Sequence, residues 1–236
     1  MAEKILEEET KTIAREIIRH CPRLGLDTEK LLILNRDIMN DYKPKFTHGI
    51  YLFTETDYNE KSSFIAARDL VEKDAAANFF IANAGGKGSP GFAHWAERLG
   101  KFTGPGRVLP LNIPIPPNPK DSWINTYSES EALVDFALKE NRVTWYVVAP
   151  PFHLLRSFMT VASSSIRRGS KISFYAYPGA PQEWDEFVLH SQGKEKGTRR
   201  NLIGKELERI KEYTAVGHIE QPQNILYYMN KRKISL

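Results

Sequence analysis

The sequence predicts an α/β fold in which a mostly parallel, Rossmann-like sheet is flanked by helices, with extra N- and C-terminal helices. Three observations predict it. Short β-prone runs alternate with amphipathic helical segments between residues 48 and 180, which implies right-handed crossovers between parallel strands. The run 143–149 is almost continuously β-branched, aromatic or apolar, as in a strand buried on both faces. Two helical patterns precede the first strand.

Composition narrows the class of protein. The 236 residues are 41% hydrophobic, which is enough for a sizeable core. The net charge of +4 is spread along the chain, so a nucleic-acid partner is not demanded. Cys21 is the only cysteine, which excludes an intramolecular disulfide and fits a reducing compartment. An acidic start and the lack of a long apolar run predict a cytoplasmic chain with no membrane segment.

The chain is expected to begin with a helical extension packed on the core, over residues 1–47. Its first helix carries apolar residues at helical spacing and is predicted to end before Pro22, which cannot continue the backbone hydrogen bonding. Its second helix is predicted to start at Asp27, whose side chain suits an N-cap.

Residues 48–180 form the expected Rossmann-like core domain. Its third strand carries Pro110, which makes it a poor central strand. The expected strands lie at 49–53, 79–82, 108–111, 143–149 and 171–177, and the helices between them centre on 66–71, 92–99, 128–140 and 152–166.

Residues 181–236 are expected to form a C-terminal helical cover. A charged helix is predicted over about 198–213, and the basic residues 231–233 are interpreted as a solvated tail.

Polar segments follow several predicted strands, at the sheet edge where open α/β folds bind ligands. We therefore expect a small polar or anionic ligand there. The candidate binding residues are Thr54, Asp57, Asn83, Gly85, Gly86, Lys87, Asn125, Thr126, Ser128 and Pro151. The candidate catalytic residues are His153, Arg156 and Glu129.

One of these segments has the form of a dinucleotide-binding fingerprint. Residues 86–91 read Gly-Lys-Gly-Ser-Pro-Gly after a strand. However, the motif follows the second strand, contains a proline, and is followed by no Asp or Glu between Arg98 and Lys120. An NAD-type site is therefore disfavoured, while contact with an anionic group and a plain turn both stay open.

His153 and Arg156 lie three residues apart at the start of a predicted helix and so share one face. The positive end of the helix, a guanidinium fork and an imidazole together suit a phosphate or carboxylate. A capping histidine and a surface arginine are the alternative. Similarly, Asn125 or Thr126 fits the cap of the next helix, with Ser128 and Glu129 in a capping-box-like first turn, and Glu129 also fits contact with a ligand or with His153.

The sequence lacks the residue patterns of several other common catalytic and binding sites. The six histidines are widely separated in sequence and none pairs closely with another histidine or with Cys21, so no metal site is expected. No Gly-x-Ser-x-Gly elbow and no P-loop occur, so a serine hydrolase and a P-loop nucleotide site are not supported.

Taken in order, the segments resemble the YdcF/SanA-like domain-of-unknown-function family. A Gly-Gly loop is followed by Asn-Thr-Tyr-Ser-Glu at 125–129, by Pro-Phe-His-Leu-Leu-Arg at 151–156 and by Tyr-Pro-Gly at 177–179. The resemblance covers about residues 48–180. It implies a Rossmann-like domain of the soluble YdcF type, and S-adenosylmethionine as a possible cofactor, because a YdcF-type member is associated with binding it.

The chain departs from the family pattern at two places. Residues 54–56 read Thr-Glu-Thr where many members have a glycine-rich turn. Ser128 stands where the family's glutamate usually falls, and Glu129 is displaced by one residue, which rotates a helical side chain by about 100°.

Two hypotheses follow. The first is a small-ligand-binding protein for S-adenosylmethionine, a nucleotide or a phosphorylated metabolite, with the reaction, if any, left open. The alternative is a non-catalytic partner-binding or regulatory module that retains the fold. A nucleic-acid binder has only charge in its favour, from Lys194, Lys196, Arg199, Arg200 and Lys205.

Overall fold

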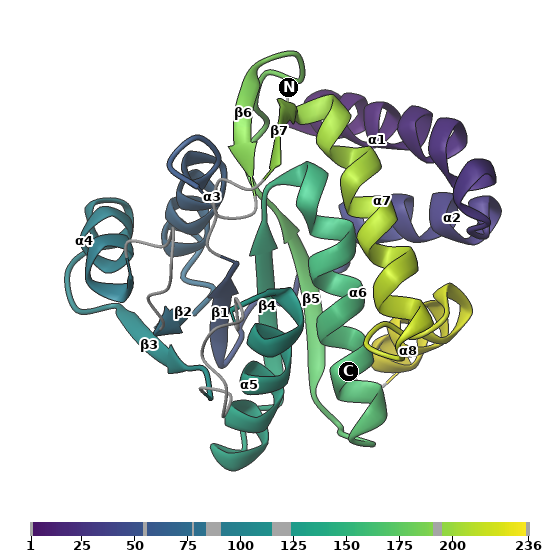
Figure 1. Ribbon diagram of the computed structural model, residues 1–236. Helices are drawn as coiled ribbons and strands as arrows, with labels where there is room; N and C mark the ends of the chain where they lie inside the picture. Colours follow the sequence, from purple (N-terminus) through teal and green to yellow (C-terminus); the bar gives the residue numbers. More distant parts are fainter. Residues whose placement is uncertain are drawn as a thin grey trace.

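Five parallel strands form the centre of the structure, in the order β3-β2-β1-β4-β5 (Figure 1). They confirm the predicted α/β fold class. The strands are β1 (Gly49–Leu52), β2 (Phe79–Asn83), β3 (Val108–Asn112), β4 (Thr144–Ala149) and β5 (Ser173–Pro178). The computed structural model describes residues 2–53, 56–76, 78–83, 91–114, 124–190 and 195–234.

Helices cover both faces of the sheet. On one face lie α3 (Glu60–Glu72) and α4 (Phe92–Thr103), and on the other lie α5 (Thr126–Lys139) and α6 (Pro151–Arg167). Four more helices gather beside α6 and the β5 edge: α1 (Ala2–Leu24), α2 (Thr28–Met39), α7 (Arg199–Ala215) and α8 (Pro222–Ile234) (Figure 1). A small antiparallel hairpin of β6 (Phe187–His190) and β7 (Glu195–Thr198) stands apart from the sheet.

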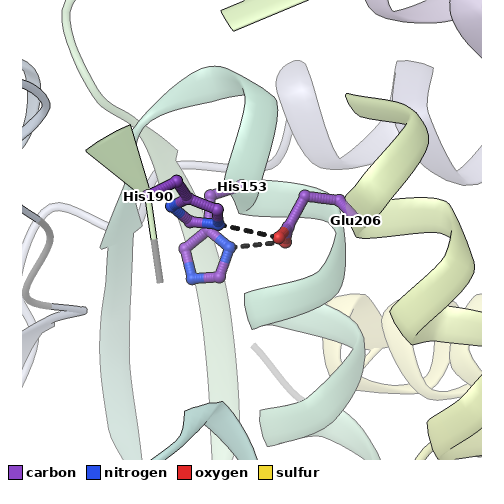
Figure 2. A group of neighbouring side chains, drawn as sticks. All are labelled: His153, His190 and Glu206. Atoms are coloured by element: carbon purple, nitrogen blue, oxygen red, sulfur yellow. Dashed lines mark hydrogen bonds and ion pairs between the residues drawn. The ribbon is translucent and has the colours of Figure 1, made fainter. Parts of the chain in front are cut away.

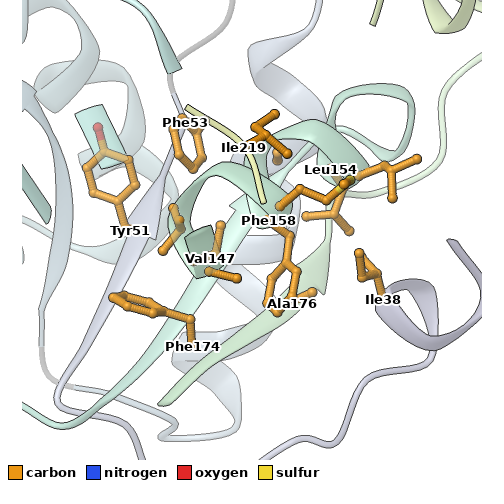
Figure 3. Close-up of a cluster of buried hydrophobic side chains, with 14 of the residues drawn as sticks. Ile38, Tyr51, Phe53, Val147, Leu154, Phe158, Phe174, Ala176 and Ile219 are labelled. Atoms are coloured by element: carbon orange, nitrogen blue, oxygen red, sulfur yellow. The ribbon is translucent and has the colours of Figure 1, made fainter. Parts of the chain in front are cut away.

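The two faces divide the core according to strand alternation. In β1, Ile50 and Leu52 pack toward α3 and α4, whereas Tyr51 packs in the cluster that includes α5 and α6. Figure 3 shows the second cluster, in which Val147 of the sheet and Phe158 of α6 are buried together. The helix α6 is buried from Pro151 to Ser165, because it lies between the sheet and the outer helices.

The two edge strands of the sheet are protected in different ways, and the terminal parts of the chain protect the edge of β5. Pro110 lies in β3 at the outer edge, as its missing N–H requires. At the opposite edge, the N–H of Ala176 donates to Asp41 Oδ2 at 2.8 Å, and the N–H of Phe174 donates to Tyr228 Oη at 2.8 Å. Residues from both ends of the chain therefore satisfy the open edge of β5.

The prediction that Arg232 lies in a solvated tail is wrong. Arg232 belongs to α8, is only 4% exposed, and forms an ion pair with the buried Asp41. Its guanidinium also lies 4.4 Å from the centre of the Tyr175 ring. The apolar positions Ile225 and Met229 on the same helix are buried, and they anchor this end of the chain in the core.

The first helix also differs from its prediction. It continues through Pro22 to Leu24, and the chain then turns at Gly25, whose φ of +68° a glycine adopts without strain. The N–H of Leu26 donates to the Cys21 carbonyl at 3.1 Å, so a left-handed glycine cap ends the helix. The predicted start of α2 is confirmed, because Asp27 accepts from the Lys30 N–H at 3.0 Å.

Replacing Arg232 with methionine should destabilise the protein by about 3–5 kcal/mol, because Asp41 is left as a buried charge without its cation. Chemical denaturation measures this change. The exposed Asn230 on the same helix supplies the control, and Asn230→Ala should cost no more than about 0.5 kcal/mol. Equal effects of the two variants would contradict the buried role of Arg232.

A second prediction concerns Glu9 of α1, which is buried and accepts from the indole N–H of Trp184 at 3.1 Å. Burial raises the pKa of Glu9 from 4.5 to about 7. The folded state thus holds this proton more tightly than the unfolded chain, so ionisation costs stability as the pH rises from 4.5 to about 7.

We therefore expect Glu9→Gln to raise the free energy of unfolding by about 2 kcal/mol at pH 8, with the gain vanishing near pH 4.5. Urea titrations across this range measure it. The neighbouring exposed Glu8→Gln is the control and should show no such pH dependence. A gain at pH 4.5 as large as that at pH 8 would refute the ionisation argument.

Candidate functional site

The candidate site lies at the carboxyl edge of the sheet, where the strand order changes direction between β1 and β4. The chain moves from β1 to β2 and β3 on one side and then returns to pair β4 with the other side of β1. In open sheets this reversal is where ligands bind. The helix α6 begins directly after β4 and brings His153 and Arg156 to this edge.

Glu206 of α7 is the centre of a buried polar cluster. Its Oε2 accepts from Arg156 Nε at 2.6 Å and lies 2.6 Å from His153 Nδ1. Its Oε1 lies 2.9 Å from His190 Nε2 and accepts from Arg209 at 3.3 Å. Figure 2 shows the two imidazoles, from α6 and β6, directed at the two oxygens of this one carboxylate.

The charges in the cluster determine its protonation. Burial by itself opposes ionisation of Glu206, but the positive charge of Arg156 and contacts with both histidines hold the pKa of Glu206 well below its ordinary range. An ionised carboxylate can only accept hydrogen bonds. His153 therefore carries a proton on Nδ1, and His190 carries one on Nε2.

Arg156 extends the cluster to α5. Its Nη1 donates to Thr126 Oγ1 at 2.7 Å, and its guanidinium lies 5.8 Å from the centre of the Tyr213 ring. Arg156 is 4% exposed, so the sequence-based alternative of a surface arginine is wrong. Three of the residues predicted from the sequence, Thr126, His153 and Arg156, are thus brought together.

The capping interpretation of the Asn-Thr turn is confirmed. Asn125 accepts from the Ser128 N–H at 3.0 Å, and Ser128 Oγ accepts from the Asn125 N–H at 3.0 Å, forming a reciprocal capping box. Asn125 and Ser128 therefore fix the start of α5. Thr126, which follows Asn125, accepts a hydrogen bond from Arg156.

Glu129 lies one turn further along α5 and is buried on the same side of the sheet. Its Oε2 accepts from Tyr51 Oη at 2.7 Å. Burial, followed by the charge of Glu129, raises the pKa of Tyr51 well above 10. The tyrosine thus stays protonated and links β1 to α5.

The other predicted residues lie apart from the cluster or outside the described part of the chain. Pro151 is buried at the first position of α6, where its missing N–H is harmless. Asn83 donates to Asn112 Oδ1 at 2.8 Å at the exposed end of β2. Asp57 lies before α3, on the opposite face of the sheet. Thr54, Gly85, Gly86 and Lys87, with residues 86–90 of the glycine motif, lie outside the described residues.

Sequence reasoning missed Glu206 and His190, although each leaves a signal. Glu206 follows Leu202 and Ile203 and precedes Ile210 at helical spacing, which places a carboxylate on the buried stripe of a charged helix. His190 alternates with Val188 in β6, and both are buried. A charged or polar residue in a buried register needs a partner, and that requirement could have revealed both.

The histidines do meet in space, against expectation. The ring centres of His153 and His190 are 5.4 Å apart, and their donor atoms lie within 4.8 Å of the Glu206 carboxylate. A metal ion is nevertheless a poor occupant. It would have to displace the protons that face Glu206, and the single carboxylate already accepts from two arginines, Arg156 and Arg209, which would repel a cation.

Comparison with known proteins leaves the family open. No family model, no curated protein and no solved structure matches this chain. The YdcF/SanA-like resemblance therefore stays a prediction from the ordered motifs. Among the described residues, no helix has the length and apolar character needed to cross a membrane.

Replacing Glu206 with glutamine should cost about 3–5 kcal/mol at neutral pH, since Arg156 then remains as a buried charge without its carboxylate. Because the folded pKa of Glu206 is depressed, its contribution is present above pH 4.5 and is lost as the pH falls through the folded pKa. The variant should thus lose less stability on acidification than the wild type.

Denaturant titrations at neutral and acidic pH measure both effects. Glu208→Gln on the same helix is the matched control, because Glu208 forms a solvent-exposed pair with Lys205 at 2.9 Å. A Glu206 variant that resembled this control would contradict the central role given to the buried carboxylate.

Proposed function

We propose that the chain binds a small ligand with a phosphate or carboxylate group at the carboxyl edge of the sheet, between β1 and β4. S-adenosylmethionine, nucleotides and phosphorylated metabolites are the candidates, the first by family resemblance alone. The supporting observation is that Arg156 and His153, three residues apart at the start of α6, both contact the Glu206 carboxylate at the strand-order reversal.

The local electrostatics favour an anionic group. The start of α6 presents the positive end of a 17-residue helix. Pro151 has no N–H, and the N–H groups of His153 and Leu154 donate to the Pro150 carbonyl, so the helix dipole and the side chains carry the attraction. Arg156 is held in place by Glu206 and Thr126, so its guanidinium has one defined orientation. A pre-oriented guanidinium next to a helix start is a common arrangement for phosphate or carboxylate recognition.

His153 is our candidate for proton transfer. Glu206 fixes its Nδ1 proton, and the second ring nitrogen lies on the side of the imidazole away from the carboxylate (Figure 2). A carboxylate behind a histidine orients the ring and raises the basicity of the other nitrogen. This arrangement supports acid–base chemistry and assigns no covalent nucleophile.

A specific observation also supports the alternative of a non-catalytic module. Glu206 has its charge met by Arg156, with both histidines adding hydrogen bonds, so the cluster stabilises the fold without any ligand. A partner-binding protein could retain it for that reason alone. A nucleic-acid function is not proposed, since Arg199, Arg200 and Lys205 are paired with Glu186, Asp185 and Glu208.

Thermal shift with S-adenosylmethionine, nucleotides, nucleotide sugars and sugar phosphates tests the proposal. A ligand at about 100 times its Kd should raise the Tm of the wild type by about 5–10 °C. Arg156→Lys should weaken that binding about 10-fold or more, because a lysine ammonium cannot reproduce the planar donor geometry of the guanidinium. Arg232→Lys is the matched control, since it alters another buried arginine whose carboxylate partner is Asp41.

The outcomes separate the two functions. Loss of the shift in Arg156→Lys but not in Arg232→Lys supports the assigned site. Equal shifts in both variants and the wild type would place the ligand elsewhere. No shift with any compound, together with stoichiometric capture of a protein partner by the full chain, would favour the non-catalytic module.

A further inference from the structure

A second polar cluster occupies the opposite face of the sheet, between the starts of α3 and α4. Asp57 lies in the turn before α3, Glu60 is the first residue of α3, and His94 is the third residue of α4. One donor atom from each residue lies within 4.8 Å of the others. Three metal-ligating side chains, two from helices and one from the turn before α3, thus converge at one point.

Two atoms of this cluster are buried without a hydrogen-bond partner in the described part of the chain. They are Glu60 Oε2 and His94 Nε2. Glu60 is only 4% exposed, and its other oxygen pairs with Arg98. His94 Nε2 lies 3.6 Å from Asp57 Oδ1, which is longer than a normal hydrogen bond. Buried polar atoms are rarely left unsatisfied, so each of these calls for an explanation.

The charges around the cluster favour an added cation close to the carboxylates. Glu60 pairs with Arg98 through one oxygen only, and Asp57 lies 3.6 Å from the imidazole of His94. The two neighbouring carboxylates thus have Arg98 as the one arginine in an ion pair with them among the described residues. The remaining basic groups are Lys61, on the exposed side of α3, and Lys101, which pairs with Glu97 at 3.1 Å.

An open hollow adjoins Asp57 and Glu60, and His94 is not among its lining residues. It has a volume of about 340 Å³ and is lined by Asp57, Glu60, Lys61, Phe64, Arg98, Lys101 and Phe102. An ion bound by the three side chains could complete its coordination with water or an exogenous oxygen ligand from this hollow, as in three-ligand metal sites with an open position.

We propose that Asp57, Glu60 and His94 bind a divalent cation, with Zn²⁺ as the first candidate. One imidazole nitrogen and two carboxylate oxygens are typical zinc ligands, and the mixed donor set is poorly suited to Mg²⁺ or Ca²⁺. Bonds of about 2.0–2.2 Å place two donors at most about 4.4 Å apart. Small side-chain rotations therefore close the cluster around one ion and satisfy both unpaired atoms.

Isothermal titration of the full, untagged chain with Zn²⁺ after removal of bound metal by a chelator tests this site. We expect one ion per chain, and at least about 10-fold weaker binding in His94→Ala and in Glu60→Gln. Glu97→Gln, an exposed carboxylate on the same helix, is the matched control and should bind as the wild type does.

Co²⁺ gives an independent readout, because its visible absorption reports coordination by nitrogen and oxygen ligands. The spectrum of the wild type should be lost in His94→Ala and retained in Glu97→Gln. Circular dichroism in the presence of chelator establishes that each variant is folded. His94→Ala should fold normally, because the His94 side chain is partly exposed.

Unchanged Zn²⁺ binding in folded His94→Ala and Glu60→Gln would overturn the proposal, as would a wild type that binds no Zn²⁺. Loss of binding in His190→Asn with retention in His94→Ala would also overturn it, because the ion would then lie at the Glu206 cluster on the other face of the sheet.

Discussion

The buried carboxylate of Glu206 is the interaction on which the arrangement around α6 depends. It connects α7 to His153 and Arg156 of α6 and to His190 of the hairpin, and Arg156 passes the connection on to Thr126 of α5. Burying one charge without the others would cost several kcal/mol. The members of the cluster therefore stabilise the fold only as a set, which makes the packing of α7 and the hairpin specific.

A second buried pair performs a similar role at the sheet edge. Asp41 accepts from the backbone of β5 and pairs with Arg232 of α8, so one carboxylate joins the N-terminal extension, the sheet and the C-terminal helix. Tyr228 adds a second contact by donating to the Ile172 carbonyl and accepting from the Phe174 N–H. The terminal helices are thus structural parts of the fold, because they satisfy an edge that would otherwise stay open.

The two polar clusters at the carboxyl edge differ in a way that separates their chemistry. Around Glu206, two arginines and two histidines meet one carboxylate, and Arg209 also pairs with Glu195. Around Glu60, a second carboxylate lies nearby, Arg98 pairs with Glu60, and two buried atoms have no hydrogen-bond partner among the described residues. This difference is why we propose an anionic ligand at the first cluster and a cation at the second. The sheet keeps the clusters apart, because α3 and α4 cover one face and α6 covers the other.

Local patterns in the sequence predicted the fold class, the five parallel strands and most of the helices around them. Val143 to Ala149 reads as a buried strand and Asp27 as a helix cap, because strand burial and capping leave their mark within a few consecutive residues. The pairing of His153 with Arg156 on one helical face was predictable for the same reason, since three-residue spacing fixes their relative direction.

Only the tertiary structure decided which partners those residues meet. Glu206 lies 50 residues beyond Arg156 and Arg232 lies 191 residues beyond Asp41, and nothing in the local spacing relates them. The structure turned a supposed basic tail into a buried edge cover and brought two distant histidines to one carboxylate. The sequence by itself determined where strands and helices form. The charge pairing that defines the candidate site depends on long-range packing, because a charged side chain needs an oppositely charged partner only once it is buried.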